Sequence, residues 1–169
     1  MGVQQIEQLL PPPPQPQPVS PSMENSGFLQ GQPAQAFPDQ DHDSHMKSHL
    51  LLFKLPIIQK VPEGQMQMAA IIQSHIYQHV DFSAREMAQQ DPEIMQMQQQ
   101  IQQMQQQSQM DPMMMQQMQQ QIQQMQQQMQ TIMEDKVAQK TVELLQKVES
   151  DLQIGQEEDP LVGLRKEEL

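Results

Sequence analysis

The sequence has no cysteine and no tryptophan, a single tyrosine, and an aromatic content of 3%. Without cysteine, a thiol nucleophile and a thiolate metal ligand are both excluded. Apolar residues make up 36% of the chain, and 17 of them are methionines, whose flexible side chains specify packing weakly. The composition therefore predicts no single compact core.

Positive charge is scarce as well, with nine Lys plus Arg against 21 Asp plus Glu and a net charge of −12. Because phosphate binding needs cations that release counterions, we expect no direct sequence-specific binding to nucleic acid. No apolar run approaches the roughly 20 residues that cross a bilayer. Residues 1–10 also lack the basic start and long apolar centre of a signal peptide. We therefore expect a soluble chain that is not exported and has no membrane partner.

Residue patterns typical of enzymes are missing too. The sequence contains no GxSxG motif and no glycine-rich phosphate loop, and its carboxylates lie in polar runs rather than beside apolar residues that would shift their pKa. We expect no catalytic activity, no small-molecule substrate and no cofactor.

Proline dominates the first part of the chain. Four consecutive prolines at residues 11–14, followed by Pro16 and Pro18, predict an extended polyproline-like spacer. From Val19 to Gln40, glycines and prolines alternate with a few apolar residues, which favours a loop lying on another surface over any regular element. We expect residues 1–40 to be a disordered linker rich in Pro and Gln.

Residues 41–90 carry two predicted helices. The first, over Asp41–Leu55, has acidic residues at its start and a proline at position 56 that ends it. The second covers Gln65–Gln90 and follows a break around Gly64. Their apolar stripes, at helical spacing, are Met46, Leu50 and Phe53 in the first and Met68, Ile72, Ile76, Val80 and Met87 in the second.

All five histidines lie on these two helices, at spacings of three and four residues that place each group on one helical face. A zinc or nickel site needs ligands on one face, so these residues are the candidate metal ligands: His42, His45, His49, His75 and His79. However, no HExxH glutamate accompanies them, and the two groups must meet across a helical hairpin to form one site. We therefore favour histidines that line a helix–helix contact without a metal.

Residues 91–153 are rich in Gln and Met and contain a repeated decapeptide. Residues 98–107 and 119–128 both read QQQIQQMQQQ, three heptads apart, so one apolar stripe runs through both copies. Its members, which we predict to form an oligomerisation surface, are Ile94, Met97, Ile101, Met104, Met115, Met118, Ile122, Met125, Met129 and Ile132. Ser108 and Asp111 interrupt the stripe. The tract fits three states: a disordered segment, an oligomeric coiled coil, or an aggregation-prone segment.

Two Asp-Pro pairs, Asp91-Pro92 and Asp111-Pro112, have the pattern of a capped helix start. They predict a break near Asp111 and two helices of about 20 residues. A mixed-charge helix over Thr131–Gln153 follows, and Gly155 is its expected end. Residues 154–169 read as an acidic tail and the start of a truncated helix. The predicted fold class is thus mainly α, with extended helices and a coiled-coil-like region.

Four segments, taken in order, resemble the C-terminal region of portal proteins from tailed bacteriophages, notably marine ones. The first two are ENSGFLQGQPAQAFP (residues 24–38) and DQDHDSHMKSHLLLF (39–53). The others are AAIIQSHIYQHVDFSAREM (69–87) and DPLVGLRKEEL (159–169). The Gln/Met tract resembles only the composition of the variable linker in that region.

The resemblance implies a structural virion protein, part of the head–tail connector ring at one capsid vertex, assembled in the host cytoplasm and used in DNA packaging and ejection. It implies self-association and contact with portal, capsid or tail subunits. The wing, stem and clip body of a portal is not in this sequence, so we expect a C-terminal portion or fragment. The alternative is a glutamine-rich interaction or regulatory scaffold without a virion role.

Overall fold

The computed structural model describes residues 11–60, 66–107 and 111–157. Within these ranges the chain is mainly helical and has no strand, which confirms the mainly-α prediction. The helices are α2 (Pro21–Leu29), α3 (His42–Phe53), α4 (Pro56–Gln59), α5 (Met66–Gln89), α6 (Pro92–Gln107) and α7 (Pro112–Glu157).

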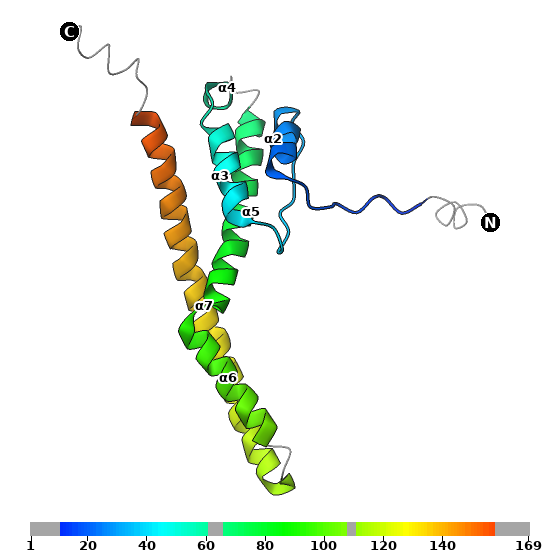
Figure 1. Cartoon of the computed structure of the whole chain (residues 1–169), viewed down its shortest axis with the longest axis vertical. Coiled ribbons are helices and arrows are strands. Elements are labelled where there is room, and N and C mark those ends of the chain that lie inside the picture. Colours follow the sequence, from blue (N-terminus) through cyan, green and yellow to red (C-terminus); the bar gives the residue numbers. More distant parts are fainter. Residues whose placement is uncertain (1–10, 61–65, 108–110, 158–169) are drawn as a thin grey trace.

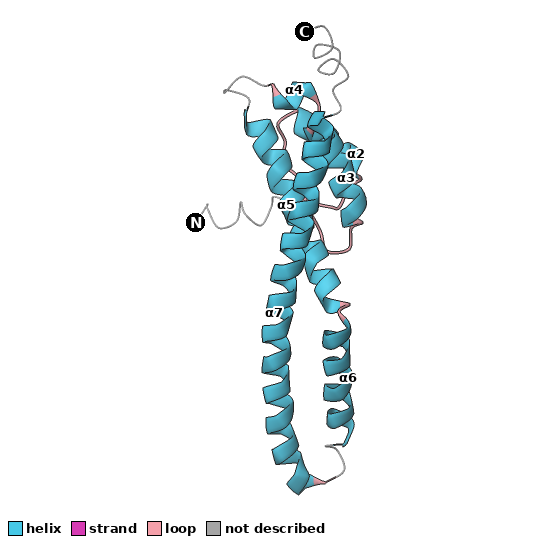
Figure 2. Ribbon diagram, turned by 90° about the vertical axis from the view of Figure 1, so that its left-hand side faces the viewer, coloured by secondary structure: helices cyan, strands magenta, loops and turns pink. Residues whose placement is uncertain are grey.

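The molecule is elongated (Figure 1). Helices α2, α3, α4 and α5 form a head at one end, and α6 with the first half of α7 forms a two-helix hairpin at the other. The 46 residues of α7 span about 69 Å at 1.5 Å per residue. Its first half runs antiparallel to α6, and its second half continues alongside α5 toward the head (Figure 2). The long helix thus joins the hairpin to the head.

The hydrophobic core lies in the head, between α2, α3, α4 and α5. Leu144, Leu145 and Val148 of α7 pack against it from one side. The buried members of the core are Phe28, Met46, Leu50, Leu52, Ile58, Ile72, Ile76 and Val80.

The two histidine-bearing helices form as the sequence predicts. Asp41 caps α3 by accepting a hydrogen bond from the Ser44 backbone N–H at 3.1 Å. The apolar stripe predicted for α5 is correct up to Val80 but wrong at Met87, which is 41% exposed. Ala84 and Ala88 are the buried residues on that part of α5.

The expected loop over residues 19–40 is wrong for Pro21–Leu29, which forms α2. Proline at the first helical position starts α2, and Gly31 ends it with a left-handed φ of 75°. Phe28 is fully buried, so this segment belongs to the head core of its own chain. Residues 11–20 form neither helix nor strand, and residues 1–10 lie outside the described ranges.

The Gln/Met stripe becomes the contact between α6 and α7. Ile94, Ile101 and Ile122 are at most 8% exposed, whereas the glutamines between them are exposed. All other predicted members are partly buried except Met115, which is 41% exposed. The two decapeptide copies therefore pair within one chain, and self-association through this stripe stays a prediction.

Both Asp-Pro helix starts form as predicted. Asp91 accepts from the Glu93 N–H at 3.0 Å, and Asp111 accepts from the Met113 N–H at 3.1 Å. Lys136 of α7 lies 3.3 Å from Asp91 and 3.2 Å from Glu93, and so ties α7 to the α5–α6 joint.

The predicted separate helix over Thr131–Gln153 is wrong, because α7 runs without a break from Pro112 to Glu157. The expected stop at Gly155 is passed by two residues. The predicted truncated helix after residue 160 lies outside the described residues. Among the described helices, none combines the length and apolar character needed to cross a membrane.

Candidate metal centre

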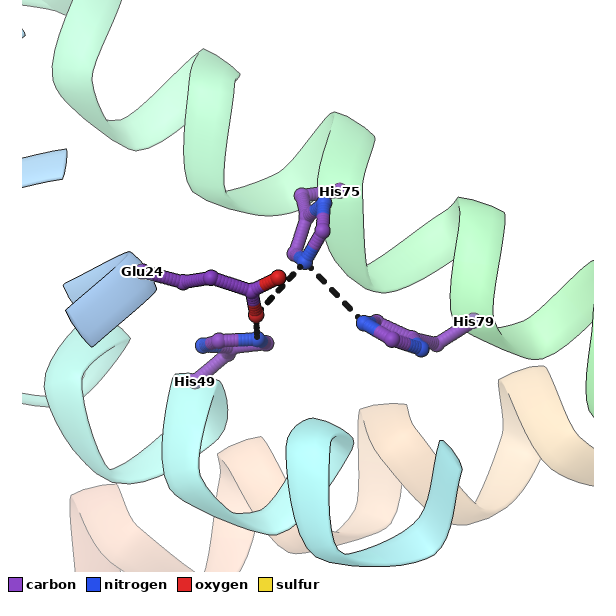
Figure 3. Close-up of side chains that lie close together, drawn as sticks. All are labelled: Glu24, His49, His75 and His79. Atoms are coloured by element: carbon purple, nitrogen blue, oxygen red, sulfur yellow. Dashed lines mark hydrogen bonds and ion pairs between the residues drawn. The ribbon is translucent and has the colours of Figure 1, made fainter. Parts of the chain in front are cut away.

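Six buried polar side chains meet inside the head. All five histidines are at most 6% exposed, and Glu24 of α2 is 3% exposed. The histidines at positions 42, 45 and 49 come from α3, and those at 75 and 79 come from α5. Figure 3 shows Glu24, His49, His75 and His79 pointing toward one another from these three helices. The structure thus brings both predicted histidine groups together and adds a carboxylate.

Local packing holds α2 and its glutamate in this position. The ring of Phe28, one turn after Glu24, lies with its centroid 5.3 Å from those of both His49 and His75. Asn25 donates to the Ser48 hydroxyl at 3.0 Å and accepts from His49. Aromatic and amide contacts of the residues that follow Glu24 therefore fix α2 against α3 and α5.

The centre of the cluster is a short chain of close contacts (Figure 3). Glu24 Oε2 lies 3.0 Å from His49 Nε2 and 3.2 Å from His75 Nε2. His75 Nε2 lies 3.0 Å from His79 Nε2. One potential ligand atom from each of these four residues lies within 4.8 Å of the other three.

Hydrogen bonds outside the centre fix the proton positions on His49 and His75. His75 Nδ1 lies 3.1 Å from the carbonyl oxygen of Ala34, which only accepts, so Nδ1 carries the proton. His49 Nδ1 lies 2.7 Å from Asn25 Oδ1, whose amide is oriented by donation to Ser48, so this Nδ1 also donates. In their neutral forms both rings therefore direct an Nε2 lone pair at the centre.

His42 fixes the position of the proton on His79. His42 Nε2 lies 3.1 Å from the carbonyl oxygen of Pro38 and donates to it, which leaves a lone pair on His42 Nδ1. His79 Nδ1, 2.8 Å away, donates to that lone pair. His79 Nε2 is then a third lone pair facing the centre, and His42 acts as an orienting residue.

His45 lies at the rim of the cluster. Its Nδ1 donates to the Asp41 carbonyl oxygen at 2.8 Å, while Gln40 Nε2 lies 3.3 Å from its Nε2. His45 Nε2 is 3.6 Å from Glu24 Oε2, longer than the contacts made by His49 and His75. Of the five candidate ligands, the geometry thus places His49, His75 and His79 at the centre. His42 lies behind His79, and His45 lies at the rim.

The electrostatics favour an ionised Glu24 and neutral rings at His49 and His79. Burial raises the pKa of Glu24, but the His49 and His75 rings, which donate to the carboxylate only when they are protonated at Nε2, outweigh this and lower that pKa to about 2. Burial lowers the pKa of His79 to about 3, with the neighbouring histidines adding to the effect, and burial also lowers the pKa of His49. Glu24 Oε1 is buried without a hydrogen-bond partner. The arrangement combines one carboxylate with three nitrogen donors.

Sequence reasoning missed Glu24, because residues 19–40 were expected to form a loop. A signal was present: Ser20-Pro21 has the cap-then-proline pattern that identified the starts of α6 and α7. The expected role of the histidines, lining a helix–helix contact, agrees with their burial between α3 and α5.

No protein-family model, curated protein or solved structure matches this chain.

Proposed function

We propose that this chain is a structural virion protein, the C-terminal part of a phage portal subunit that takes part in ring assembly and in DNA packaging and ejection. The observation that carries the proposal is the packing of the resembling segments. Residues 24–53 and 69–87 form α2, α3 and α5, which share one core and one histidine cluster. Three of the four resembling segments thus form one structural unit, and the fourth, residues 159–169, lies outside the described residues.

The shape of the molecule suits a subunit of a ring. The head offers a compact block, and the α6–α7 hairpin projects from it as a rod (Figure 1). The glutamines along this rod are exposed. Ring symmetry would place many such rods side by side and raise their effective concentration for weak lateral contacts. The net charge of −12 would limit adhesion of the chain to passing DNA.

The rival function is a glutamine-rich interaction scaffold without a virion role. The exposed glutamines of the hairpin favour it, because such a surface makes many weak polar contacts and selects no partner strongly. Both functions need self-association or partner binding, so the hairpin alone does not separate them.

A genetic reconstruction separates the two functions. The DNA on both sides of the gene is sequenced, and any neighbouring portal body is co-expressed with this chain and examined for rings by electron microscopy. The portal proposal predicts an adjacent portal-body frame, a nearby terminase gene and rings that contain this chain. Ordinary cellular genes on both sides would reject it and leave the scaffold.

The contribution of the hairpin is tested in the same reconstruction. Ile101→Asp with Ile122→Asp places charges at buried positions between α6 and α7, whereas Gln103→Asp places one at an exposed position of α6. Ring yield and DNA packaging should fall for the double variant and stay unchanged for the control. Equal yields for both would show that the hairpin has no part in assembly.

A further inference from the structure

The spacing of four buried groups in the head fits a tetrahedral metal ion. At zinc–nitrogen and zinc–oxygen bonds of about 2.0 Å, ligand atoms lie about 3.3 Å apart. Three contacts are already 3.0, 3.2 and 3.0 Å: Glu24 to His49, Glu24 to His75, and His75 to His79. The remaining separations do not exceed 4.8 Å, so small side-chain rotations complete the tetrahedron.

The surrounding hydrogen bonds are those that metal-bound histidines use. A ligating imidazole commonly donates its other N–H to a carboxylate, carbonyl or similar acceptor, which fixes the tautomer. Here His49 donates to Asn25, His75 donates to the Ala34 carbonyl, and His79 donates to His42. In the neutral forms of the rings, His49 and His75 therefore present Nε2 lone pairs to the Glu24 carboxylate, and His79 presents a third beside them.

That arrangement calls for a positive charge at the centre. Neutral Nε2 atoms at 3.0 and 3.2 Å from a carboxylate oxygen place lone pair against lone pair. Glu24 Oε1, buried and without a hydrogen-bond partner, adds a second uncompensated acceptor. A divalent cation balances the carboxylate and accepts all of these lone pairs at once.

We propose that Glu24, His49, His75 and His79 bind one Zn²⁺ ion. Zinc commonly binds imidazole nitrogens together with a carboxylate oxygen. Magnesium and calcium instead prefer sites in which every ligand atom is an oxygen. Four protein ligands fill a tetrahedral shell, so the site is a structural one that joins α2 to α3 and α5. This inference is independent of the portal proposal.

The rival account is a polar core in which protons take the place of the metal. In that case His49 or His75 is protonated at Nε2 and donates to Glu24, and zinc does not displace the proton. The two accounts differ in zinc affinity and stoichiometry, which makes a titration decisive.

The test uses the full chain, purified without a histidine tag and stripped with EDTA, and titrated with Zn²⁺ against a chromophoric chelator. We expect one ion per chain with a dissociation constant of about 10 nM or below, the range of structural zinc sites. His79→Gln and Glu24→Gln each remove a ligand and should weaken binding more than about 100-fold. His42→Gln removes an orienting partner and should weaken it about 10- to 100-fold.

His45→Gln is the matched control, because His45 is buried on the same helix face but lies at the rim. It should bind zinc as tightly as the unaltered chain. Circular dichroism confirms that each variant is folded, and Co²⁺ titration of the unaltered chain gives a visible spectrum characteristic of tetrahedral coordination. Absence of binding at micromolar Zn²⁺, or equal affinity in His79→Gln and His45→Gln, would overturn the proposal.

Discussion

Phe28→Ala tests how α2 is held in the head. The Phe28 side chain is 0% exposed, belongs to the core cluster and contacts both His49 and His75. A buried phenylalanine covers about 200 Å², which corresponds to about 5 kcal/mol at 25 cal/mol per Å². Measured Phe→Ala changes in cores cost about 3–5 kcal/mol. We expect the free energy of unfolding to fall by about 4 kcal/mol.

The assay is urea unfolding of the metal-free chain followed by far-ultraviolet circular dichroism. With a slope of about 2 kcal/mol per M, the midpoint should fall by about 2 M. Met23→Ala is the control, because Met23 lies on the same helix and is 65% exposed. Its effect should stay within about 0.5 kcal/mol. A Phe28→Ala midpoint equal to that of Met23→Ala would refute the packing of α2 on the head.

Three further predictions concern the hairpin, a helix cap and pH. Ile101→Ala empties a buried position, 7% exposed, between α6 and α7 and should cost about 2 kcal/mol or more in thermal or urea unfolding. Asp111→Ala removes the cap of α7 and should cost about 1 kcal/mol in the same assay. The metal-free chain should lose stability as pH falls from about 6.5 toward 3, because burial lowers the pKa of His79 to about 3 and the unfolded chain binds the proton first. The lowered pKa of Glu24, about 2, adds a loss in the same direction below about 4.5, measured as urea midpoints across pH.

Each of these has its own control and refutation. Gln103→Ala, at an exposed position of α6, should change the free energy of unfolding by no more than about 0.5 kcal/mol. If Ile101→Ala changes it no more than Gln103→Ala does, the packing of α6 against α7 is contradicted. Asp111→Asn keeps a capping oxygen and should retain most of the stability that Asp111→Ala loses. A urea midpoint that does not change between pH 6.5 and 4 would contradict a buried, neutral His79.

The helices that the sequence predicted best are those with strong periodicity. The spacing of Ile94, Ile101 and Ile122 identified a contact surface that the structure buries. The partner of that surface was not predictable, since identical decapeptides pair equally well within a chain or between chains. Helix α6 ends at Gln107 and α7 starts at Pro112, beside the predicted break at Asp111, and the two helices lie antiparallel in one chain (Figure 2).

For the candidate site, the sequence predicted the histidines but neither their meeting in one cluster nor the part of Glu24 in it. Helical spacing placed the histidines on two faces, but the meeting of these faces depends on tertiary packing of α3 on α5. Glu24 depends on the nine-residue helix α2, whose stability comes from Phe28 and Asn25 contacts rather than from its own periodicity. A short helix of this kind leaves little pattern in the sequence.

X-ray absorption at the zinc edge of the metal-loaded chain tests the central claim most directly. The account predicts four ligands at about 2.0 Å, with the multiple-scattering pattern of three imidazoles and one oxygen. Six light ligands without imidazole scattering, or a spectrum that is the same in His75→Gln with His79→Gln, would contradict a zinc centre at Glu24, His49, His75 and His79.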